Sequence, residues 1–310
     1  MRILFLVIFL CVSTIGFAQI PLGYYTTALG YTGDSLKFKL NDIIDNHIEF
    51  PYTSSSTDVW DILKQTDRDT ANSSNVMLLY SGWSVDANQE YNSGVGWSRE
   101  HVWAKSRGNF GTAIGPGTDV HAIRPCDISV NSARNNRWFA ECTEEYIDAD
   151  GPTGSYWSST EWIWKPNDKV KGDVARMIFY MATRYEGERG EPDLEVIDSI
   201  PVNNSTNLPI HAKLSDLMRW HVEDTVDEWE RNRNDIIYYS FQQNRNPFID
   251  HPEYAELIWG NFVGVKRSLP VQKKKLMKVM NLFGIEVNPS PNQILFYLYS
   301  DGSVEKKIFQ

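Results

Sequence analysis

Hydrophobic residues recur at intervals of three and four positions in several parts of the chain, a pattern typical of amphipathic helices. In the first such segment, Leu36, Leu40 and Ile44 fall on one face, while Lys37 and Asp42 fall elsewhere. Helices are therefore expected over residues 36–44, 59–64, 170–181 and 214–241. Between the last two, many Pro, Asn and Ser residues predict a loop.

Short strands are expected where apolar residues form brief or alternating runs. Such runs occupy residues 76–80, 94–103 and 120–123. Pro125 is expected to end the third strand, because proline has no amide hydrogen to donate across a sheet. Asp127 can then cap a following helix.

That helix is expected to carry Asn131, Asn135 and Trp138 on one face, at spacings of four and three. Residues 97–138 therefore predict a strand, a glycine-rich connection, a second strand and a helix.

The two ends of the chain differ in composition from the middle. Arg2 precedes an apolar run, and Gly16 and Ala18 occupy the small-residue positions of an export signal cleaved between Ala18 and Gln19. Lysines crowd around Pro270, and an alternating run with an Asp-Gly turn follows, which predicts a β-hairpin.

We therefore divide the chain into a signal peptide (1–18), a main domain (19–265) and a basic linker with a β-hairpin tail (266–310). The tail resembles, over a short stretch, the C-terminal sorting domains of secreted bacterial proteins. We expect a secreted or periplasmic protein with no membrane span.

Composition limits the classes of function that are open. Of 310 residues, 42% are hydrophobic, which is enough to form a core, but 30 Lys and Arg against 40 Asp and Glu give a net charge of −10. The overall basic surface of many nucleic-acid-binding proteins is therefore absent. Any phosphate ligand must be bound by a local basic patch or by a metal ion. Whether Cys126 and Cys142 pair is left open.

The window 97–138 is the electropositive exception, with a local charge of +3, and it contains two of the six histidines. Phosphodiester cleavage needs a base for the attacking water and a cation beside the phosphate oxygens. His101 suits the base, because an imidazole titrates near neutral pH. The carboxylate of Glu100 and the amide of Asn131 offer the oxygen ligands that Mg²⁺ prefers.

Three motifs in this window resemble those of the endonuclease I family of secreted, non-specific nucleases. They are Glu100-His101-Val102, the segment Asp119 to Pro125 and the segment Asn131 to Asn136, and a later block from Val226 to Phe248 is also similar. The resemblance implies an α+β fold, mostly helical, with a small antiparallel sheet and a ββα-metal (His-Me finger) core. It also implies cleavage of DNA, and of RNA as well, to 5′-phosphate ends. We expect a monomer.

Carried over by position, the resemblance implies that His101 is the general base and that Glu100 and Asn131 hold one Mg²⁺, with Mn²⁺ or Ca²⁺ as alternatives. Ala104 stands where the family often has proline. Arg107 is the nearest candidate for the arginine that steadies the leaving group.

The remaining polar residues of the window are assigned by their chemistry. Arg99, Arg124 and Arg134 are candidates for phosphate binding, although Arg124 and Arg134 could equally form ion pairs with Asp119 or Asp127. Supporting roles are expected for Asp119, His121 and Asn135.

One geometric demand follows from Glu100 and His101 being adjacent. Neighbours on a regular strand point to opposite faces, so both reach one site only if the strand ends, twists or bulges there. Two other functions stay open: an exported polysaccharide- or cell-surface-binding protein without enzymatic activity, and a zinc phosphatase.

Overall fold

The computed structural model describes residues 20–201, 207–260, 276–281, 284–288, 293–299 and 304–309. The chain forms two compact units, residues 1–265 and 266–310. The expected signal peptide lies outside the described residues. Within the described ranges, no helix is both long enough and apolar enough to cross a bilayer.

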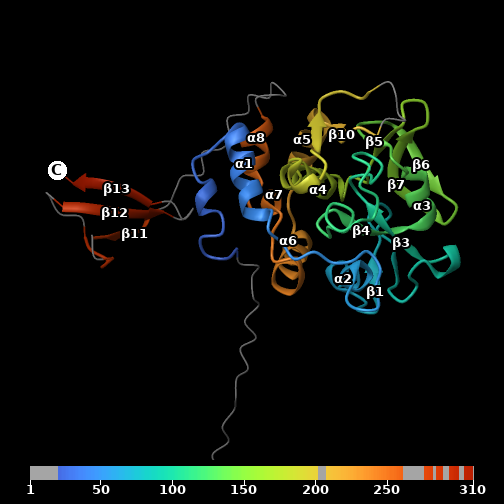
Figure 1. The fold of residues 1–310 in the computed structure, drawn as a ribbon, viewed down its shortest axis with the longest axis horizontal. Helices are drawn as coiled ribbons and strands as arrows, with labels where there is room; N and C mark the ends of the chain where they lie inside the picture. The colour runs from blue at the N-terminus through green and yellow to red at the C-terminus, as the bar shows by residue number, and fades with distance from the viewer. Residues whose placement is uncertain are drawn as a thin grey trace, which may run out of the picture. The chain divides into compact units, whose positions relative to one another are not determined.

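The first unit is built around α4 (Lys171–Arg184), every residue of which is buried. Helices α1, α5 and α7 pack on α4, and α8 packs on α1 (Figure 1). The helices of this unit are α1 (Gly33–Ile44), α2 (Val59–Thr66), α3 (Ile128–Arg134), α5 (Leu214–Glu223), α6 (Glu228–Ile236), α7 (Pro247–Asp250) and α8 (Glu253–Trp259), with short η helices at Thr26–Ala28, Asn92–Gly94, Glu188–Gly190 and Ile237–Phe241.

Four small sheets lie beside these helices in the described part of the first unit, so the fold is α+β. Two are antiparallel pairs, β1 (Asn75–Met77) with β2 (Ser84–Asp86) and β3 (Trp97–His101) with β4 (Ile123–Asp127). The third has the order β5 (Trp138–Phe139), β8 (Ile163–Lys165), β7 (Gly151–Ser158) and β6 (Glu144–Asp148). The fourth pairs β9 (Glu195–Ile197) with β10 (Ile210–Lys213) in parallel. The sequence pattern predicted only three strands in this unit, so most of these strands were not expected.

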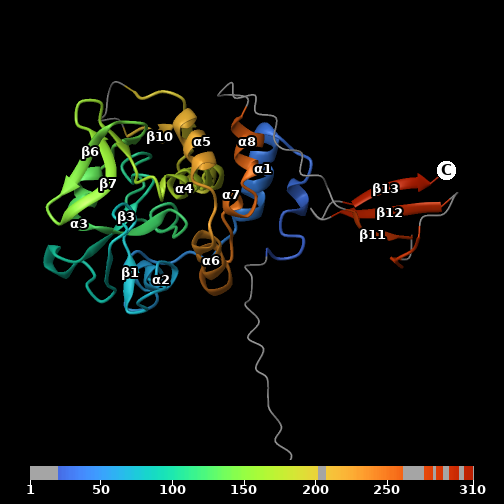
Figure 2. The same cartoon turned by 180° about the vertical axis from the view of Figure 1, so that it is seen from behind.

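Helix α3 follows β4 directly, and both views place it close to β3 and to the β6–β7 hairpin (Figures 1 and 2). The predicted order of strand, connection, strand and helix is therefore present. Its first strand, β3, is shorter than the predicted run 94–103 and ends at His101.

The expectation that Pro125 ends the second strand is wrong, because Pro125 lies inside β4, opposite Arg99. Its carbonyl oxygen accepts a hydrogen bond from Leu79 N–H, on the side away from β3. In an antiparallel pair, every second residue directs its amide and carbonyl away from the partner strand. Proline is tolerated at such a position because no hydrogen bond to β3 is lost.

The expectation that Asn131, Asn135 and Trp138 share one face of a helix is also wrong. Helix α3 ends at Arg134, Asn135 follows with a φ of +53°, and Trp138 already belongs to β5. A positive φ cannot continue a right-handed helix, and Asn adopts it more readily than most residues. Likewise, the expected helix 214–241 is interrupted, because Asp227 and Glu230 form a capping box that starts α6.

The second unit is a three-stranded antiparallel sheet with the order β11 (Leu276–Met280), β12 (Gln293–Tyr299) and β13 (Val304–Phe309). Strands β12 and β13 form the hairpin expected from the alternating run. Strand β11 was not foreseen, because it comes from the lysine-rich stretch that was expected to be a linker.

Candidate active site

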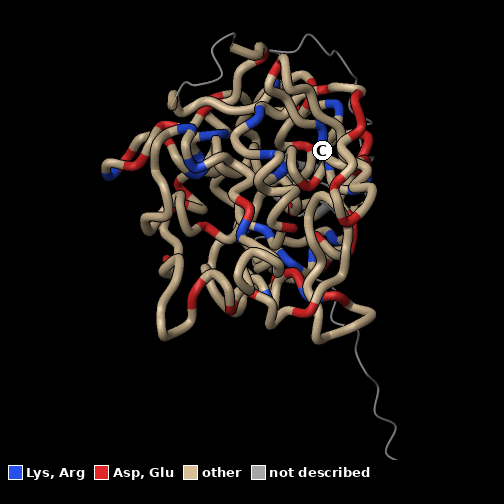
Figure 3. The backbone as a smooth tube through the Cα atoms, turned by 90° about the vertical axis from the view of Figure 1, so that its right-hand side faces the viewer, with Lys and Arg blue, Asp and Glu red and all other residues tan. Residues whose placement is uncertain are grey.

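A cavity of about 430 Å³ lies at the end of β3, next to α3. Its lining includes Glu100 and His101 from β3 and Asn131 from α3, so the three residues expected to carry the chemistry face one space. The basic residues of the lining are Arg99, Lys105 and Arg134, against one acidic residue, Glu100. Acidic and basic residues are otherwise interspersed along the chain (Figure 3).

Glu100 and His101 are the last two residues of β3, and both line the cavity. The register of β3 with β4 is regular up to its last pair, His101 with Ile123. No bulge separates the two residues, so the expected bulge is absent, and the cavity lies at the end of the strand where side chains of both faces can reach it.

Two side chains fix the carboxylate of Glu100, which is only 2% exposed. The hydroxyl of Tyr80 donates to Oε1 at 2.8 Å, and Nη1 of Arg134 lies 3.1 Å from the same oxygen. Burial raises the pKa of Glu100, while the charge of Arg134 opposes that rise. Arg134 thus favours the ionised form that a metal ligand requires.

The imidazole of His101 is held by a backbone carbonyl and an aromatic ring. Its Nε2 lies 3.0 Å from the carbonyl oxygen of Gly117, and its ring stacks on Tyr52. A carbonyl can only accept, so Nε2 carries the proton and Nδ1 keeps its lone pair. Burial lowers the pKa of His101 to about 4, which leaves the ring neutral at neutral pH.

Gly117 is required where it lies, because a Cβ at this position would come within 2.5 Å of the carbonyl oxygen of Ala113. The glycine-rich connection between the strands therefore folds back tightly enough to present a carbonyl to His101.

Asn131 is oriented through its amide nitrogen. Nδ2 donates to Ser98 Oγ at 3.0 Å and lies 3.4 Å from the carbonyl oxygen of Arg99. The amide oxygen is therefore the end of the side chain that can serve a ligand. The position of Asn131 depends on the start of α3, where the carboxylate of Asp127 accepts from two backbone amides as predicted.

Arg134 joins β3 to α3 and is buried. Nη1 donates to the carbonyl oxygen of His101 at 3.0 Å, and Nη2 donates to that of Val102 at 2.6 Å. With Glu100 also bound, the guanidinium is engaged by the protein, and the ion-pair alternative describes it better than phosphate binding. The acidic partner is Glu100, however, and not Asp119 or Asp127.

The other expected arginines have different surroundings. Arg99 lines the cavity, and its guanidinium lies over the ring of Tyr52 and donates to Thr53 Oγ1. Arg124 is buried in an ion pair with Asp67 and is not among the residues that line this cavity.

Arg107 is also absent from the lining. Its Nε donates to the carbonyl oxygen of Asn136 at 3.0 Å, and its guanidinium lies over Trp138. Burial and the nearby charge of Arg134 lower the pKa of Arg107 to about 9.

Asp119 and His121 connect the entry of β4 to distant elements. Asp119 Oδ2 accepts from the hydroxyls of Tyr180 and Tyr185 on and after α4, and His121 Nε2 lies 3.1 Å from the carbonyl oxygen of Asn244. Neither residue lines the cavity, and their supporting roles stay predictions. The tyrosines were missed, because nothing in an apolar helix pattern distinguishes a hydroxyl that serves a site.

Asn135 lines the cavity, and its Oδ1 accepts from the backbone amide of Asn136 at 2.8 Å. Tyr80 was missed for a similar reason as the α4 tyrosines: it closes an apolar run that shows no sign of chemistry. Cys126 and Cys142 are free thiols.

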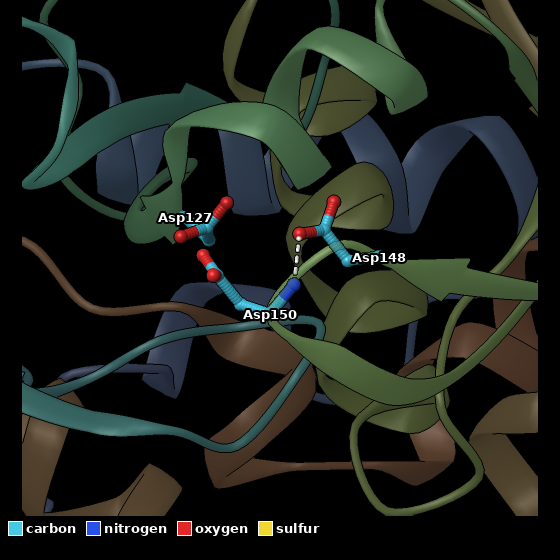
Figure 4. A group of neighbouring side chains, drawn as sticks. All are labelled: Asp127, Asp148 and Asp150. Atoms are coloured by element: carbon cyan, nitrogen blue, oxygen red, sulfur yellow. Dashed lines mark hydrogen bonds between the residues drawn. The ribbon is translucent and has the colours of Figure 1, made fainter.

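Carboxylates also gather outside the cavity. Asp127, Asp148 and Asp150 have oxygens within 4.8 Å of one another, where the start of α3 meets the β6–β7 turn (Figure 4). Asp148 already accepts from Tyr146 OH and from the backbone amide of Asp150, while Asp127 caps α3. Hydrogen bonds within the fold therefore explain why Asp127 and Asp148 lie here.

A sequence model described as Endonuclease I matches residues 32–253, most of the chain. The chain belongs to the endonuclease I family. Extracellular ribonucleases of Bacillus subtilis and Bacillus amyloliquefaciens are each 50% identical to it over 236 residues, which cover 76% of this chain and 78% of each relative.

Membership of the endonuclease I family makes this chain a nuclease and a hydrolase, which confirms the expected family and class of enzyme. The alternatives of a non-enzymatic binding protein and a zinc phosphatase are therefore set aside. The model match spans the three motifs and the later block from Val226 to Phe248.

Proposed function

We propose that this chain is an exported, monomeric, divalent-metal-dependent endonuclease that hydrolyses RNA and DNA with little sequence specificity. One observation carries the proposal: Glu100, His101 and Asn131 line a single cavity that also holds Arg99 and Lys105. The Bacillus relatives, named extracellular ribonucleases, support RNA as a substrate and support export through the signal at residues 1–18.

The residues present fit a hard divalent cation. Glu100 offers a carboxylate that Tyr80 and Arg134 hold in place, and Asn131 offers an amide oxygen because its nitrogen is engaged elsewhere. Two protein oxygens suit Mg²⁺, which keeps several waters, and Mn²⁺ or Ca²⁺ accept the same ligands. When bound, the ion supplies positive charge beside the phosphate and the leaving oxygen. The strands β3 and β4 with α3 would then constitute the ββα-metal core.

His101 acts as the general base in this mechanism. Nδ1 takes a proton from water as the water oxygen attacks phosphorus, while Nε2–H stays hydrogen-bonded to Gly117. The bond between phosphorus and the 3′ oxygen breaks, and that oxygen takes a proton from solvent. The products carry 5′-phosphate and 3′-hydroxyl ends.

The basic residues divide into two roles. Arg99 and Lys105 line the cavity and are assigned to the phosphates of the strand. Arg134 is a positioning residue that acts through Glu100, and Arg107 and Arg124 support the fold through the contacts described above. The same holds for Asp119 and His121, which brace the second strand.

The test is cleavage of plasmid DNA and of single-stranded RNA by the full chain, with Mg²⁺ and with a chelator. We expect cleavage only with the ion. Substitution of the base, His101→Ala, should lower kcat by about 10²- to 10⁴-fold, the usual contribution of a positioned base. The matched control, His251→Ala, removes a histidine outside the cavity and should leave kcat unchanged.

The metal ligands are tested by binding as well as by activity. Glu100→Gln keeps the shape of the side chain but removes its charge, so it should weaken Mn²⁺ binding measured by calorimetry. Cleavage that persists in chelator, or that persists in His101→Ala at the original rate, would refute the mechanism.

A further inference from the structure

Tyr91 is an exposed aromatic residue on the lining of the active-site cavity. Its relative exposure is 58%, although it shares the cavity with the buried Glu100 and His101. Tyr52, which lies against the same histidine, has its ring covered by the guanidinium of Arg99. The ring of Tyr91 is by contrast largely open to solvent, and the proposed mechanism does not use it.

The backbone around Tyr91 adopts an uncommon conformation. Three consecutive residues, Tyr91, Asn92 and Ser93, have φ angles of 50°, 33° and 57°. Positive φ is unfavourable for residues with a Cβ, and most of all for a bulky one such as tyrosine. Such conformations persist where the surrounding structure enforces them, and they gather at functional sites.

The surrounding structure does enforce this turn. The amide of Tyr91 donates to the carbonyl oxygen of Trp97 at 2.8 Å, and the carbonyl oxygen of Tyr91 accepts from Gly94 at 2.7 Å. Gly96 is needed for the return of the chain, because a Cβ there would lie 1.8 Å from the carbonyl oxygen of Gln89. Trp97 is fully buried and begins β3, so the turn is fastened to the strand that carries Glu100.

We propose that Tyr91 is a stacking platform for a nucleobase next to the scissile phosphate. The inference rests on the proposed function, because it requires a nucleic-acid strand in the cavity. If the phosphate lies at Glu100 and Asn131, with Arg99 and Lys105 along the backbone of the strand, an adjacent base can reach the rim where Tyr91 lies. Every base has a flat π face, so stacking holds a strand without reading its sequence.

The substrate class follows from the geometry of stacking. A base in a duplex is already stacked between its neighbours, so it must leave that stack before it can lie on Tyr91. Single-stranded RNA or DNA offers its bases without that cost. Tyr91 therefore favours single-stranded substrates over duplexes at the same catalytic centre.

The experiment uses the full chain and short single-stranded oligonucleotides with one ordinary phosphodiester, the other linkages being phosphorothioates. In a series of these oligonucleotides, one base at a time is removed to leave an abasic sugar. With the native chain, we expect kcat/KM to fall roughly ten-fold when the base at one position beside the cleavable bond is missing. Tyr91→Ala should show a similar fall on the intact oligonucleotide and no further fall at that position.

Variants separate stacking from damage to the fold. Tyr91→Phe and Tyr91→Trp keep a ring and should retain the native kcat/KM. Tyr31→Ala removes a comparably exposed ring that does not line the cavity, and it should change nothing. Tyr91→Gly removes the ring but suits a positive φ, so it should lose activity like Tyr91→Ala while its melting temperature does not fall.

The proposal is wrong if Tyr91→Ala has the same kcat/KM as the native chain on the intact oligonucleotide. It is also wrong if the kcat/KM of Tyr91→Ala falls as much as that of the native chain when the base beside the cleavable bond is missing. Either result, with the native chain active, leaves the nuclease assignment intact. Failure of the native chain to cleave any of these oligonucleotides would instead refute the proposed function itself.

Discussion

Arg134 shows how a single buried side chain can hold the residues of a candidate active site together. Its guanidinium binds the carbonyl oxygens of His101 and Val102 and the carboxylate of Glu100, and the residue is buried. Glu100 is itself 2% exposed, and among the groups that favour its ionised form Arg134 has the largest effect, ahead of the hydroxyl of Tyr80 and the charge of Lys105. The ion pair therefore serves both the geometry of the site and the charge of the proposed metal ligand.

Removing Arg134 should be costly because it leaves Glu100 as an uncompensated buried charge. We expect Arg134→Met to lower the free energy of unfolding by about 3–5 kcal/mol. The double variant Arg134→Met/Glu100→Gln should regain part of this loss, since the neutral amide needs no counter-charge. Urea unfolding of both single variants and of the double variant measures the coupling.

Arg231 provides the control for this measurement. It pairs with Glu228 at the surface, with 41% and 80% of the two side chains exposed. Arg231→Met should therefore cost less than about 1 kcal/mol. Strictly additive losses in the Glu100 and Arg134 variants would show that the buried pair is not coupled.

The sequence points to the candidate catalytic residues but not to the residues that hold them in place. Glu100, His101 and Asn131 could be predicted because the chemistry of phosphodiester cleavage calls for these types and the motifs place them in order. Tyr80 could not, because a tyrosine that ends an apolar run is indistinguishable from a core residue until its hydroxyl is seen 2.8 Å from Glu100. Arg124 could not be placed either, because its partner, Asp67, is distant in the sequence.

Helix α3 carries Asn131, and its start is fixed by one side chain. Asp127 accepts from the amides of Ser129 and Val130, so Asp127→Ala should lower the free energy of unfolding by about 1 kcal/mol. Activity should fall as well, because Asn131 lies on the first turns of the helix that loses its cap. Asp127→Asn keeps a good cap and should restore both stability and activity.

A second cap provides the matched control. Asp227 caps α6 through a capping box with Glu230 and does not line the active-site cavity. Asp227→Ala should cost a similar amount of stability in thermal or urea unfolding without lowering the cleavage rate at a temperature where the variant is folded. Equal loss of activity in the two alanine variants would mean that general destabilisation, and not the position of Asn131, is responsible.

Long elements were easier to predict than short ones. Helices α1 and α4 show their apolar face over three or more turns, so the pattern fixes them. Strand β4 has five residues, and its pairing with β3 is decided by partners more than twenty positions away. The local signal at Pro125 was therefore misleading. Proline disfavours a strand in general, but Pro125 occupies a position of β4 that makes no hydrogen bond to β3, so the strand can continue through it.

The whole chain is acidic, yet the proposed substrate is a polyanion. The net charge of −10 is spread over the molecule, whereas Arg99, Lys105 and Arg134 line the cavity with Glu100 as the one acidic residue there. A local field of this kind can bind phosphate without attracting nucleic acid over the entire surface.

Buried imidazoles should make the folded chain sensitive to acid. Burial lowers the pKa of His121 and of His221 to about 4, and it also lowers the pKa of His211 well below its usual value. Between pH 6.5 and 4, these imidazoles therefore bind protons in the unfolded chain but stay neutral in the folded chain. Stability is full above this window and is lost as the pH falls through it, by up to about 3 kcal/mol each for His121 and His221.

His221 allows this loss to be isolated. Its Nε2 lies 2.9 Å from the carbonyl oxygen of Pro252, and Arg176 lies beside the ring. His221→Gln keeps a hydrogen-bond donor but cannot titrate, so its free energy of unfolding should fall less than that of the native chain between pH 7 and pH 5. The comparison of variants is needed because burial raises the pKa of Glu230, which acts in the opposite direction. Parallel losses in urea unfolding at the two pH values would show that His221 does not contribute to the acid sensitivity.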